Sequence, residues 1–291
     1  MKFLVLLLTF ILQRKLNLTI SRQHDQWARR FLTFFEAQLP VIRHHATLYV
    51  MIAIILPALA LLLLLTLVDG LLYGVGTLFV HIVMLFLCLG CGYLKQAVEL
   101  YLSQWEAGSY QSAFRTLEDA EIVIQNAETM TPAEIHYHAC SQFMYQTFQR
   151  YFMVIFWYMV GGPVGALVAR LAHVAGSTPR VYVPSQMVVI YQLLEWLPVR
   201  LLGLTFALVG NFSATLKNAL NYLIDPATPP LPLLQAAAAG AVESYPERPV
   251  RGEADALKDS RQMIGLRDLL NRAMMVWFSL IAVLTIVGWM S

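Results

Sequence analysis

The sequence predicts an all-α fold, that of a polytopic integral membrane protein with a helical hairpin on its cytoplasmic side. Of the 291 residues, 58% are hydrophobic and only 13% are charged, whereas soluble domains carry about 25% charged residues. Several uncharged apolar stretches approach or exceed the roughly 20 residues that a helix needs to cross a bilayer. The net charge of +2 gives no electrostatic reason to expect nucleic acid as a partner. We therefore expect the lipid bilayer to be the main partner and residues 1–291 to form a single membrane domain.

Four stretches are predicted to be transmembrane helices: residues 46–68, 71–94, 151–171 and 274–290. Only Asp69 and Gly70, a dipeptide typical of turns, separate the first two, so these form a hairpin with a very short loop. Trp277 and Trp289 lie near the ends of the last stretch, where amphipathic rings suit membrane interfaces. Residues 1–12 are apolar but too short to span, and no small-residue cleavage site follows them. We expect them to form a membrane-embedded or interfacial helix.

Basic residues orient the chain. Residues 13–45 hold six arginines and lysines against two acidic residues, and such an excess marks cytoplasmic segments. Residues 95–150 then also face the cytoplasm, because the preceding hairpin crosses the membrane twice. Thr131 and Glu134 are spaced as a capping box that opens a helix. The apolar residues earlier in this segment recur at helical spacing: Val98, Tyr101, Leu102 and Trp105. The segment is thus predicted to be a cytoplasmic helical hairpin.

Residues 184–212 are apolar enough for the membrane but contain Glu195, Pro198 and Arg200. Two alternatives stay open: a kinked amphipathic helix–turn–helix at the membrane surface, with Arg200 snorkelling to headgroups, or a fifth membrane segment. In the second case Glu195 and Arg200 would pair across a break at Pro198. An ionisable group at membrane depth is a candidate functional site, so these two residues and Arg170 are candidates for lining a ligand cavity.

The stretch "FWYMVGGPVGALVARL" raises the question of why Gly161, Gly162, Pro163 and Gly165 occur inside an apolar helix. Small residues four apart let helices approach closely in lipid, so helix packing is the role we expect for them and for Pro198. Pro163 leaves the carbonyl of the residue four positions earlier, Met159, without its helical donor. That acceptor needs another donor, for which Arg200 is the candidate.

The region after residue 225 is rich in proline and charge, which predicts an irregular loop over 225–265 containing one short helix near 231–242. No glycine-rich phosphate loop is present. His136 and His138 point to different faces of a helix, which argues against a shared metal ion. Cys88 and Cys91 have no second cysteine pair to complete a zinc site. We therefore expect neither a metal nor a cofactor.

Two blocks, "FWYMVGGPVGALVARLAHVAGS" and "EWLPVRLLGLTFALVGNF", resemble the AmpE family of bacterial inner-membrane proteins. The order of elements is similar over nearly the whole chain, including the basic "RKLNL" and the "HDQWARRFLTFFE" that precede the first long span. The resemblance implies a multi-pass protein of the bacterial inner (cytoplasmic) membrane. It also implies a sensory or signal-transducing role linked to β-lactamase induction, with a genetic partnership to a cytosolic amidase that clears muropeptides during cell-wall recycling.

The same blocks are distantly similar to the CobD/CbiB membrane enzymes, which join an aminopropanol unit to cobyric acid with ATP. Where that resemblance places the enzymes' acidic residues, this chain has Tyr145, Gln146, Gln149 and, approximately, Gly176. A site for a metal and phosphate needs charged oxygen ligands. The similarity therefore implies a shared fold without the ligase activity.

Two functions remain. In the first, the chain is a non-enzymatic membrane regulator, which binds a cytosolic regulatory partner through residues 95–150 and is a candidate homo-oligomer. In the alternative, it is a membrane enzyme or transporter for an amphiphilic or cell-wall-derived substrate, held in a cavity lined by Glu195, Arg200 and Arg170.

Overall fold

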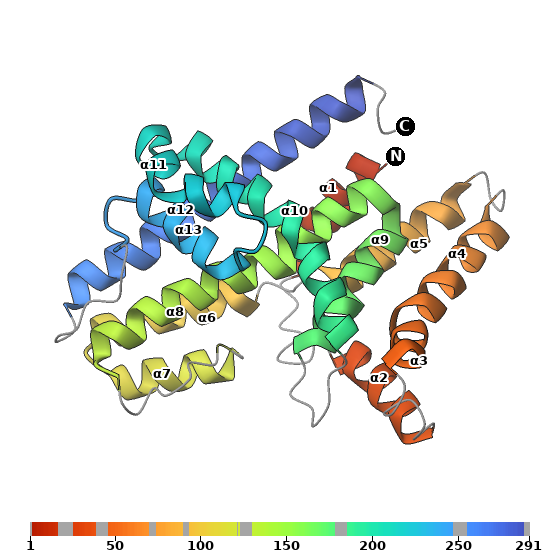
Figure 1. The fold of residues 1–291 in the computed structure, drawn as a ribbon, viewed down its shortest axis with the longest axis horizontal. Helices are drawn as coiled ribbons and strands as arrows, with labels where there is room; N and C mark the ends of the chain where they lie inside the picture. Colours follow the sequence, from red (N-terminus) through yellow and green to blue (C-terminus); the bar gives the residue numbers. More distant parts are fainter. Residues whose placement is uncertain are drawn as a thin grey trace. The chain divides into compact units, whose positions relative to one another are not determined.

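The computed structural model describes residues 2–16, 26–38, 46–69, 74–89, 93–120, 122, 130–177, 185–246 and 255–287. Every regular element in these ranges is a helix (Figure 1). Four helical stretches are long and apolar enough to cross a membrane: Thr47–Val68, Pro132–Gly176, Gln186–Val209 and Ala256–Ile286. The predicted all-α, polytopic class is therefore confirmed, and the chain is a multi-pass membrane protein that contacts the lipid bilayer.

The chain divides into two compact units. The first unit comprises Met1–Cys91, Gln149–Glu195 and Ile281–Ser291, and the second comprises Gly92–Phe148 and Trp196–Leu280. The helices of the first half of the chain are α1 (Lys2–Leu16), α2 (Gln26–Gln38), α3 (Ala46–Val50), the π-helical η2 (Met51–Ile55), α4 (Leu56–Val68) and α5 (Val75–Cys88), followed by α6 (Tyr93–Glu106) and α7 (Tyr110–Asp119). Those of the second half are α8 (Pro132–Thr147), the π-helical η5 (Phe148–Phe152), α9 (Met153–Ser177), α10 (Ser185–Val209), α11 (Phe212–Ile224), α12 (Pro230–Ala241) and α13 (Ala256–Ile286).

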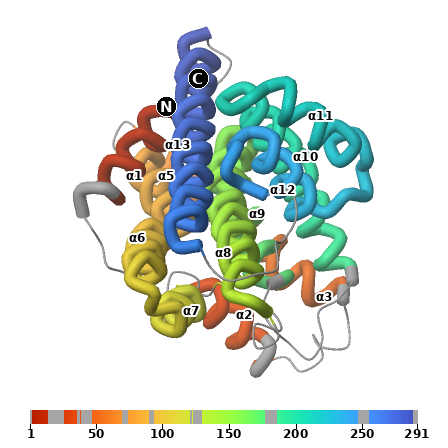
Figure 2. Tube along the Cα trace, turned by 90° about the vertical axis from the view of Figure 1, so that its left-hand side faces the viewer, coloured from red at the N-terminus to blue at the C-terminus, as the bar shows by residue number. Residues whose placement is uncertain are grey.

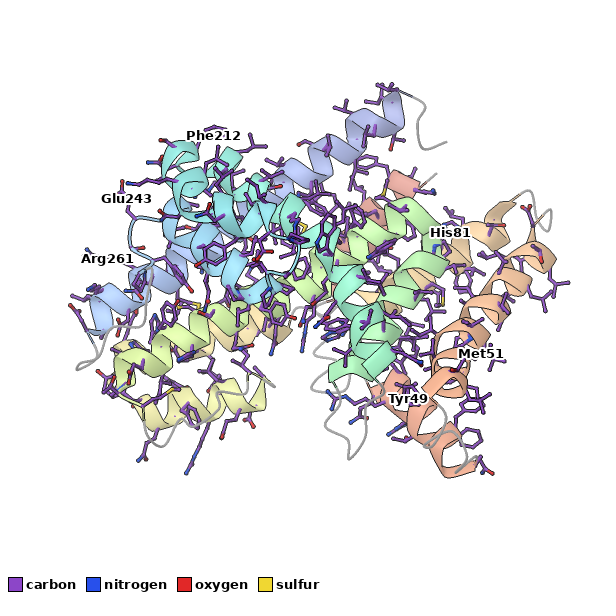
Figure 3. All side chains as sticks on the ribbon, in the orientation of Figure 1. Tyr49, Met51, His81, Phe212, Glu243 and Arg261 are labelled. Carbon is purple, nitrogen blue, oxygen red and sulfur yellow. The ribbon has the colours of Figure 1, made fainter. Side chains whose placement is uncertain are left out.

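Apolar side chains remain exposed along several of these helices, as a bilayer requires. In α4, Leu59 and Leu63 are 59% and 61% exposed, and these positions one turn apart share a face. Met51 on η2 and Phe212 at the start of α11 are also exposed and project from their helices (Figure 3). Exposure of such side chains to water is unfavourable, whereas lipid tails are as apolar as the side chains and solvate them without a protein partner.

The second unit has its core where α6, α8 and α13 lie next to one another (Figure 2). The four apolar residues expected on the inner face of α6, from Val98 to Trp105, are buried. The expected capping box is present: the Thr131 hydroxyl accepts from the amide of Glu134, whose carboxylate accepts from the amide of Thr131. The part of the predicted hairpin that precedes Thr131 consists of two helices rather than one, because the chain turns at Ala107 and Gly108 between α6 and α7.

The remaining helices differ from the predictions in two places. α10 runs through Pro198 without a break, so the turn predicted there is wrong. α12 (Pro230–Ala241) is the short helix expected near 231–242, but the predicted loop over 225–265 is too long at its C-terminal end, because α13 already begins at Ala256. α11 and α12 lie side by side (Figure 2), and Gly240 of α12 leaves no room for a Cβ against the backbone of Thr215 in α11.

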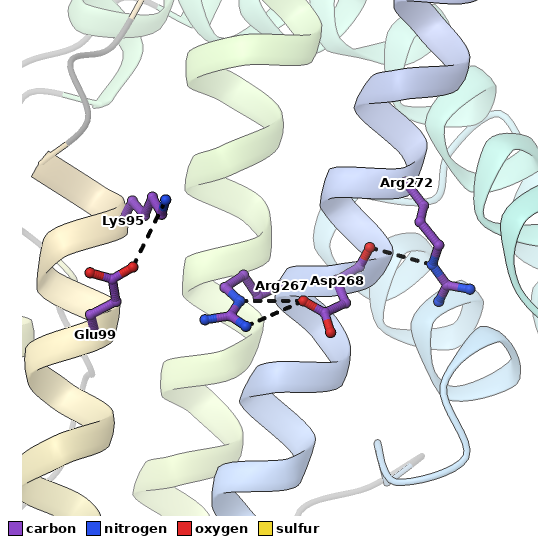
Figure 4. Close-up of polar contacts among 5 residues, drawn as sticks. All are labelled: Lys95, Glu99, Arg267, Asp268 and Arg272. Carbon is purple, nitrogen blue, oxygen red and sulfur yellow. Dashed lines mark hydrogen bonds and ion pairs between the residues drawn. The ribbon is translucent and has the colours of Figure 1, made fainter. Parts of the chain in front are cut away.

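Exposed ion pairs lie on the outer surface of the second unit. Lys95 and Glu99 are one turn apart on α6, with 3.9 Å between Nζ and Oε1, and Arg267 contacts Asp268 at 3.4 Å on α13 (Figure 4). Arg272 reaches back to the carbonyl of Asp268 at 3.4 Å. Exposed pairs of this kind contribute little to stability, so they indicate a surface in contact with water rather than a functional site.

Candidate functional site

A cluster of buried polar side chains in the first unit is the candidate site. We call Gln149, His173, Tyr191 and Glu195 the polar cluster. Glu195 is 1% exposed and Gln149 is 7% exposed. A buried carboxyl group in an apolar helix is unfavourable unless hydrogen bonds or charges compensate it, and at membrane depth such groups mark functional sites by default.

Hydrogen bonds connect the cluster in a defined direction. The Tyr191 hydroxyl donates to Oε1 of Glu195 at 2.5 Å, and Nε2 of Gln149 donates to the same oxygen at 3.0 Å and also to the Tyr191 hydroxyl. Nδ1 of His173 lies 3.2 Å from the Tyr191 oxygen. A hydroxyl has one hydrogen, and that of Tyr191 is directed to Glu195. Nδ1 of His173 must therefore carry its own hydrogen and donate to Tyr191.

Three elements place these side chains. Tyr191 and Glu195 are one turn apart on α10 and so share a face. His173 lies near the end of α9, where Gly176 is close enough to the ring of Tyr191 that an added Cβ would sit 3.4 Å from it. Gln149 comes from η5. π-helical turns occur frequently at functional sites, since the extra residue redirects a side chain.

Arg170 lies on α9 one turn before His173 and is 1% exposed. Among the described residues of the first unit, Arg170 and Glu195 are the two charged side chains that are buried. A buried charge of one sign is strongly unfavourable without a compensating charge. The first unit thus buries one basic and one acidic side chain.

Arg200 lies in the second unit and has a different set of contacts. Its guanidinium donates to the carbonyls of Leu223 at 3.1 Å, Asp225 at 2.6 Å and Trp196 at 3.0 Å, and it lies 4.3 Å from the ring centroid of Trp196. These contacts close the C-terminus of α11, where carbonyls lack helical donors and a cation is favourable. Backbone carbonyls thus bind the guanidinium of Arg200, and its pairing with Glu195 stays a prediction.

Pro163 and Pro198 each free a carbonyl inside a helix, and a side chain distant in sequence then satisfies it. Nζ of Lys2 donates to the carbonyl of Met159 at 3.3 Å, which is the acceptor freed by Pro163. The indole of Trp157 donates to the carbonyl of Leu194 at 2.9 Å, which is the acceptor freed by Pro198. The freed carbonyl of Met159 thus has a side-chain donor, but this donor is Lys2 rather than Arg200.

Two glycines of α9 have a clear role in its backbone conformation. Gly162 has φ 61° and ψ −152°, which interrupts the helix and is a conformation almost restricted to glycine. After this break, Gly165 lies against the carbonyl of Trp157 in the same element, where a Cβ would overlap backbone atoms. A Cβ added at Gly161 or Gly162 would meet no atom within 4 Å. The packing of these glycines against another helix therefore stays a prediction.

A second polar group is buried in the other unit. Nδ1 of His136 lies 2.7 Å from the Tyr101 hydroxyl and Nε2 lies 3.3 Å from Sγ of Cys140, so protein groups occupy both ring nitrogens. The indole of Trp105 donates to Asp259 at 3.2 Å. Within the described part of the chain, no three His, Cys, Asp or Glu residues are grouped to hold a metal. These contacts tie α8 and α13 to α6.

Sequence reasoning identified Glu195 and Arg170 as candidates, and the structure places both in the first unit. It missed Tyr191, although the spacing of Tyr191 and Glu195 by one turn on an apolar helix was an available signal. His173 and Gln149 join the cluster through contacts over 18 and 46 residues of sequence, which no local pattern reveals. Cys88 is buried, and Cys91 lies outside the described residues.

Comparison with known proteins identifies the family. A family model described as "Regulatory signalling modulator protein AmpE" matches residues 1–290. Protein AmpE of Shigella flexneri is 27% identical over 162 residues, an alignment that covers 51% of this chain and 56% of that protein. This chain thus matches little more than half the length of that curated relative, and no solved structure matches it significantly. Because the family model covers nearly every residue, the chain belongs to the AmpE family of regulatory signalling modulator proteins.

Proposed function

We propose that this chain is a regulatory component of the bacterial inner membrane, linked to β-lactamase induction and cell-wall recycling. The observation that carries the proposal is the match of a family of regulatory signalling modulators over residues 1–290. Helices long and apolar enough to cross a bilayer support a membrane location. The excess of basic residues over 13–45 supports a cytoplasmic position for that segment, as the distribution of lysine and arginine in membrane proteins indicates.

We further propose that residues 95–150 lie in the cytoplasm and bind a soluble regulatory partner. α7 supports this, since it has two distinct faces. Its inner face buries Ala113, Thr116 and Leu117. Its outer face carries exposed polar and charged side chains: Gln111, Ser112, Arg115, Glu118 and Asp119. A charged outer face suits water, and it offers ion pairs and hydrogen bonds to a protein surface.

The regulatory role is tested in a bacterium that has an inducible β-lactamase and lacks its copy of this gene. β-Lactamase activity is measured before and after exposure to an inducing β-lactam. We expect deletion to change the induced activity and a plasmid copy of the wild-type chain to restore it. Identical induction curves with and without the gene would overturn the proposed function.

The partner surface is tested with charge reversals on the outer face of α7, Arg115→Glu and Glu118→Lys. We expect these variants to reach the membrane in normal amounts and to behave like the deletion strain. The matched control is Lys217→Glu, a charge reversal at an exposed position on α11, which should restore induction fully. Full restoration by the α7 variants would place the partner elsewhere.

The side of the membrane is tested separately with a cysteine at Ser109, in a chain whose three native cysteines are replaced by serine or alanine. A membrane-impermeant thiol reagent added to intact cells should leave this cysteine unmodified, and should modify it once the cells are opened. Modification in intact cells would contradict the cytoplasmic assignment of residues 95–150. It would not contradict the regulatory role itself.

A further inference from the structure

We propose that Glu195 is a proton-binding site inside the first unit, and that Tyr191 and His173 carry the proton to and from it. The proposal goes beyond the regulatory role and does not depend on it, because it rests only on the contacts of the polar cluster. It assigns a ligand, the proton, to a buried carboxyl group that the fold holds in a specific hydrogen-bonded arrangement.

The first argument is the continuity of the hydrogen bonds. From His173 Nδ1 to the Tyr191 oxygen is 3.2 Å, and from that oxygen to Glu195 Oε1 is 2.5 Å. Each link joins a hydrogen-bearing donor to an acceptor in the same direction, from His173 towards Glu195. Such a chain lets protons move by small shifts along each hydrogen bond, without any group leaving its position.

The proton transfer balances at every atom. A proton taken from water protonates Nε2 of His173, so that both ring nitrogens carry hydrogen. The Nδ1 hydrogen then moves to the Tyr191 oxygen while the Tyr191 hydrogen moves to Oε1 of Glu195. His173 and Tyr191 end neutral and Glu195 ends as a carboxylic acid. Both links persist with reversed polarity, so no buried group loses its partner.

The second argument is the gradient of burial along the chain. Glu195 is 1% exposed, whereas Tyr191 and His173 are partly exposed. Histidine is also the side chain whose ordinary titration lies in the physiological pH range. His173 also lies near the C-terminal end of α9 and Tyr191 near the N-terminal end of α10, so this end of the chain is the one best placed to exchange protons with water, and the closed end is the carboxyl group.

The third argument is that both charge states of Glu195 are accommodated. The Gln149 amide donates to Oε1, and a carboxyl oxygen accepts this bond whether or not it carries a hydrogen. Charged and titratable side chains also lie on the elements around the cluster: Arg150 and Tyr151 on η5, Tyr158, Arg170 and His173 on α9, and Tyr191 on α10. Glu195 and Arg170 are the two charged side chains buried among the described residues of this unit, so proton binding at Glu195 changes the charge balance of the buried interior.

The site is tested with the full chain reconstituted in vesicles of phosphatidylcholine and phosphatidylglycerol. Infrared difference spectra between high and low pH should contain the C=O stretch of a protonated carboxyl group. Glu195→Gln should remove this band, and its amide oxygen can accept the same two hydrogen bonds, so the fold is retained. The secondary-structure bands of the same spectra report whether the fold is intact.

The route is tested by the rate at which the carboxyl band appears after a rapid drop in pH. Tyr191→Phe removes the hydroxyl that joins His173 to Glu195. The carboxyl band should then appear about 100-fold more slowly, which is the lower end of the rate enhancement that a positioned proton donor contributes. Tyr158→Phe is the matched control. Tyr158 is buried in the same unit and its hydroxyl also lies next to a histidine, 3.1 Å from Nδ1 of His81, so its loss should leave the rate unchanged.

Three results would overturn the proposal. A carboxyl band that persists in Glu195→Gln would assign the proton to another group. The absence of any carboxyl band in the folded wild-type chain would mean that Glu195 stays ionised and only stabilises the structure. Equal rates in Tyr191→Phe and Tyr158→Phe would exclude the route through Tyr191. Because these spectra do not measure β-lactamase induction, failure of this proposal and failure of the regulatory role are distinguishable.

Discussion

The indole of Trp157 donates a hydrogen bond to the carbonyl of Leu194, with 2.9 Å between nitrogen and oxygen. This carbonyl is the one that Pro198 deprives of its helical donor, because proline has no amide hydrogen. A residue on α9 thus replaces a hydrogen bond missing inside α10. Away from water an unsatisfied carbonyl costs several kcal/mol, so the contact explains why α10 continues through a proline that usually ends or kinks a helix.

Replacing Trp157 by phenylalanine should therefore destabilise the protein chiefly when Pro198 is present. We expect Trp157→Phe to lower the free energy of unfolding by about 1–3 kcal/mol, the cost of leaving a buried acceptor unpaired. In a Pro198→Ala background the helix supplies its own donor to Leu194, so the same substitution should cost less. Thermal unfolding of the four proteins in one detergent measures this coupling. An equal loss in both backgrounds would show that Trp157 acts through packing alone.

The three glycines of α9 should respond to alanine in a defined order. Gly162→Ala places a side chain in a backbone conformation that costs about 1–3 kcal/mol for other residues. Gly165→Ala should be similarly or more harmful, because its Cβ would overlap the backbone of Trp157. Gly161→Ala should be neutral or stabilise by about 0.5–1 kcal/mol, since alanine is favoured over glycine within a helix.

Membrane-inserted yield and thermal stability of the three variants measure this order. It reverses the prediction from sequence for Gly161, which treats the glycines as one packing face. A loss at Gly161→Ala as large as that at Gly165→Ala would restore the packing role and contradict the break at Gly162.

Local signals predicted much of this fold correctly. The capping box at Thr131 involves residues three apart, so a short motif contains the whole arrangement. The composition of Thr47–Val68, which α3, η2 and α4 form together, predicts a helix of spanning length, because no tertiary contact is needed to decide it. Glycine and proline disfavour a helix wherever they occur, so Gly162 and Pro163 are also recognisable locally as unusual residues for a helix.

The contacts that shape the candidate site were not predictable in this way. Pro163 indicates that the carbonyl of Met159 needs a donor, but nothing local identifies Lys2, which is 157 residues away in sequence. The pattern of Glu195 and Arg200 suggested an ion pair, yet the end of α11 supplies carbonyls that the sequence does not place beside Arg200. Long-range pairing decides which of several chemically suitable partners a polar side chain meets.

Arg200 should be required for stability through its contacts with backbone carbonyls. Arg200→Ala leaves the carbonyls of Leu223 and Asp225 without this donor and should lower the free energy of unfolding by about 1–3 kcal/mol. Arg200→Lys should recover part of this loss, because its ammonium group can still donate to a carbonyl. The recovery should be incomplete, because one ammonium group cannot reproduce the planar fork of donors. Asp225→Asn is the matched control: it keeps the backbone carbonyl and an acceptor for the amide of Ala227, and it removes only the charge of an exposed carboxylate. We expect it to be clearly milder, and thermal unfolding that ranks it with Arg200→Ala would assign the effect to charge.

Alkaline pH should weaken the second unit through its buried tyrosines. Burial raises the pKa of Tyr245 and that of Tyr101 above the ordinary value of 10.0. Above about pH 10 these phenols ionise in the unfolded chain but remain neutral in the folded one. The unfolded state then binds fewer protons, so the free energy of unfolding falls as pH rises. The stability that comes from keeping these phenols neutral is fully present below their pKa in the unfolded chain. It is lost as pH rises from that value through their pKa in the folded chain.

Tyr245→Phe removes one of these groups. Its unfolding free energy should fall less steeply above pH 10 than that of the wild type, by about 1.4 kcal/mol per pH unit for the one proton involved. The Tyr245 hydroxyl lies 2.8 Å from that of Ser141, so Ser141→Ala is the control that removes this hydrogen bond and keeps the buried phenol. Chemical unfolding between pH 9 and about 11 should give Ser141→Ala the wild-type slope at a lower overall stability. A wild-type slope for Tyr245→Phe would mean that Tyr245 ionises equally in both states and is not protected by burial.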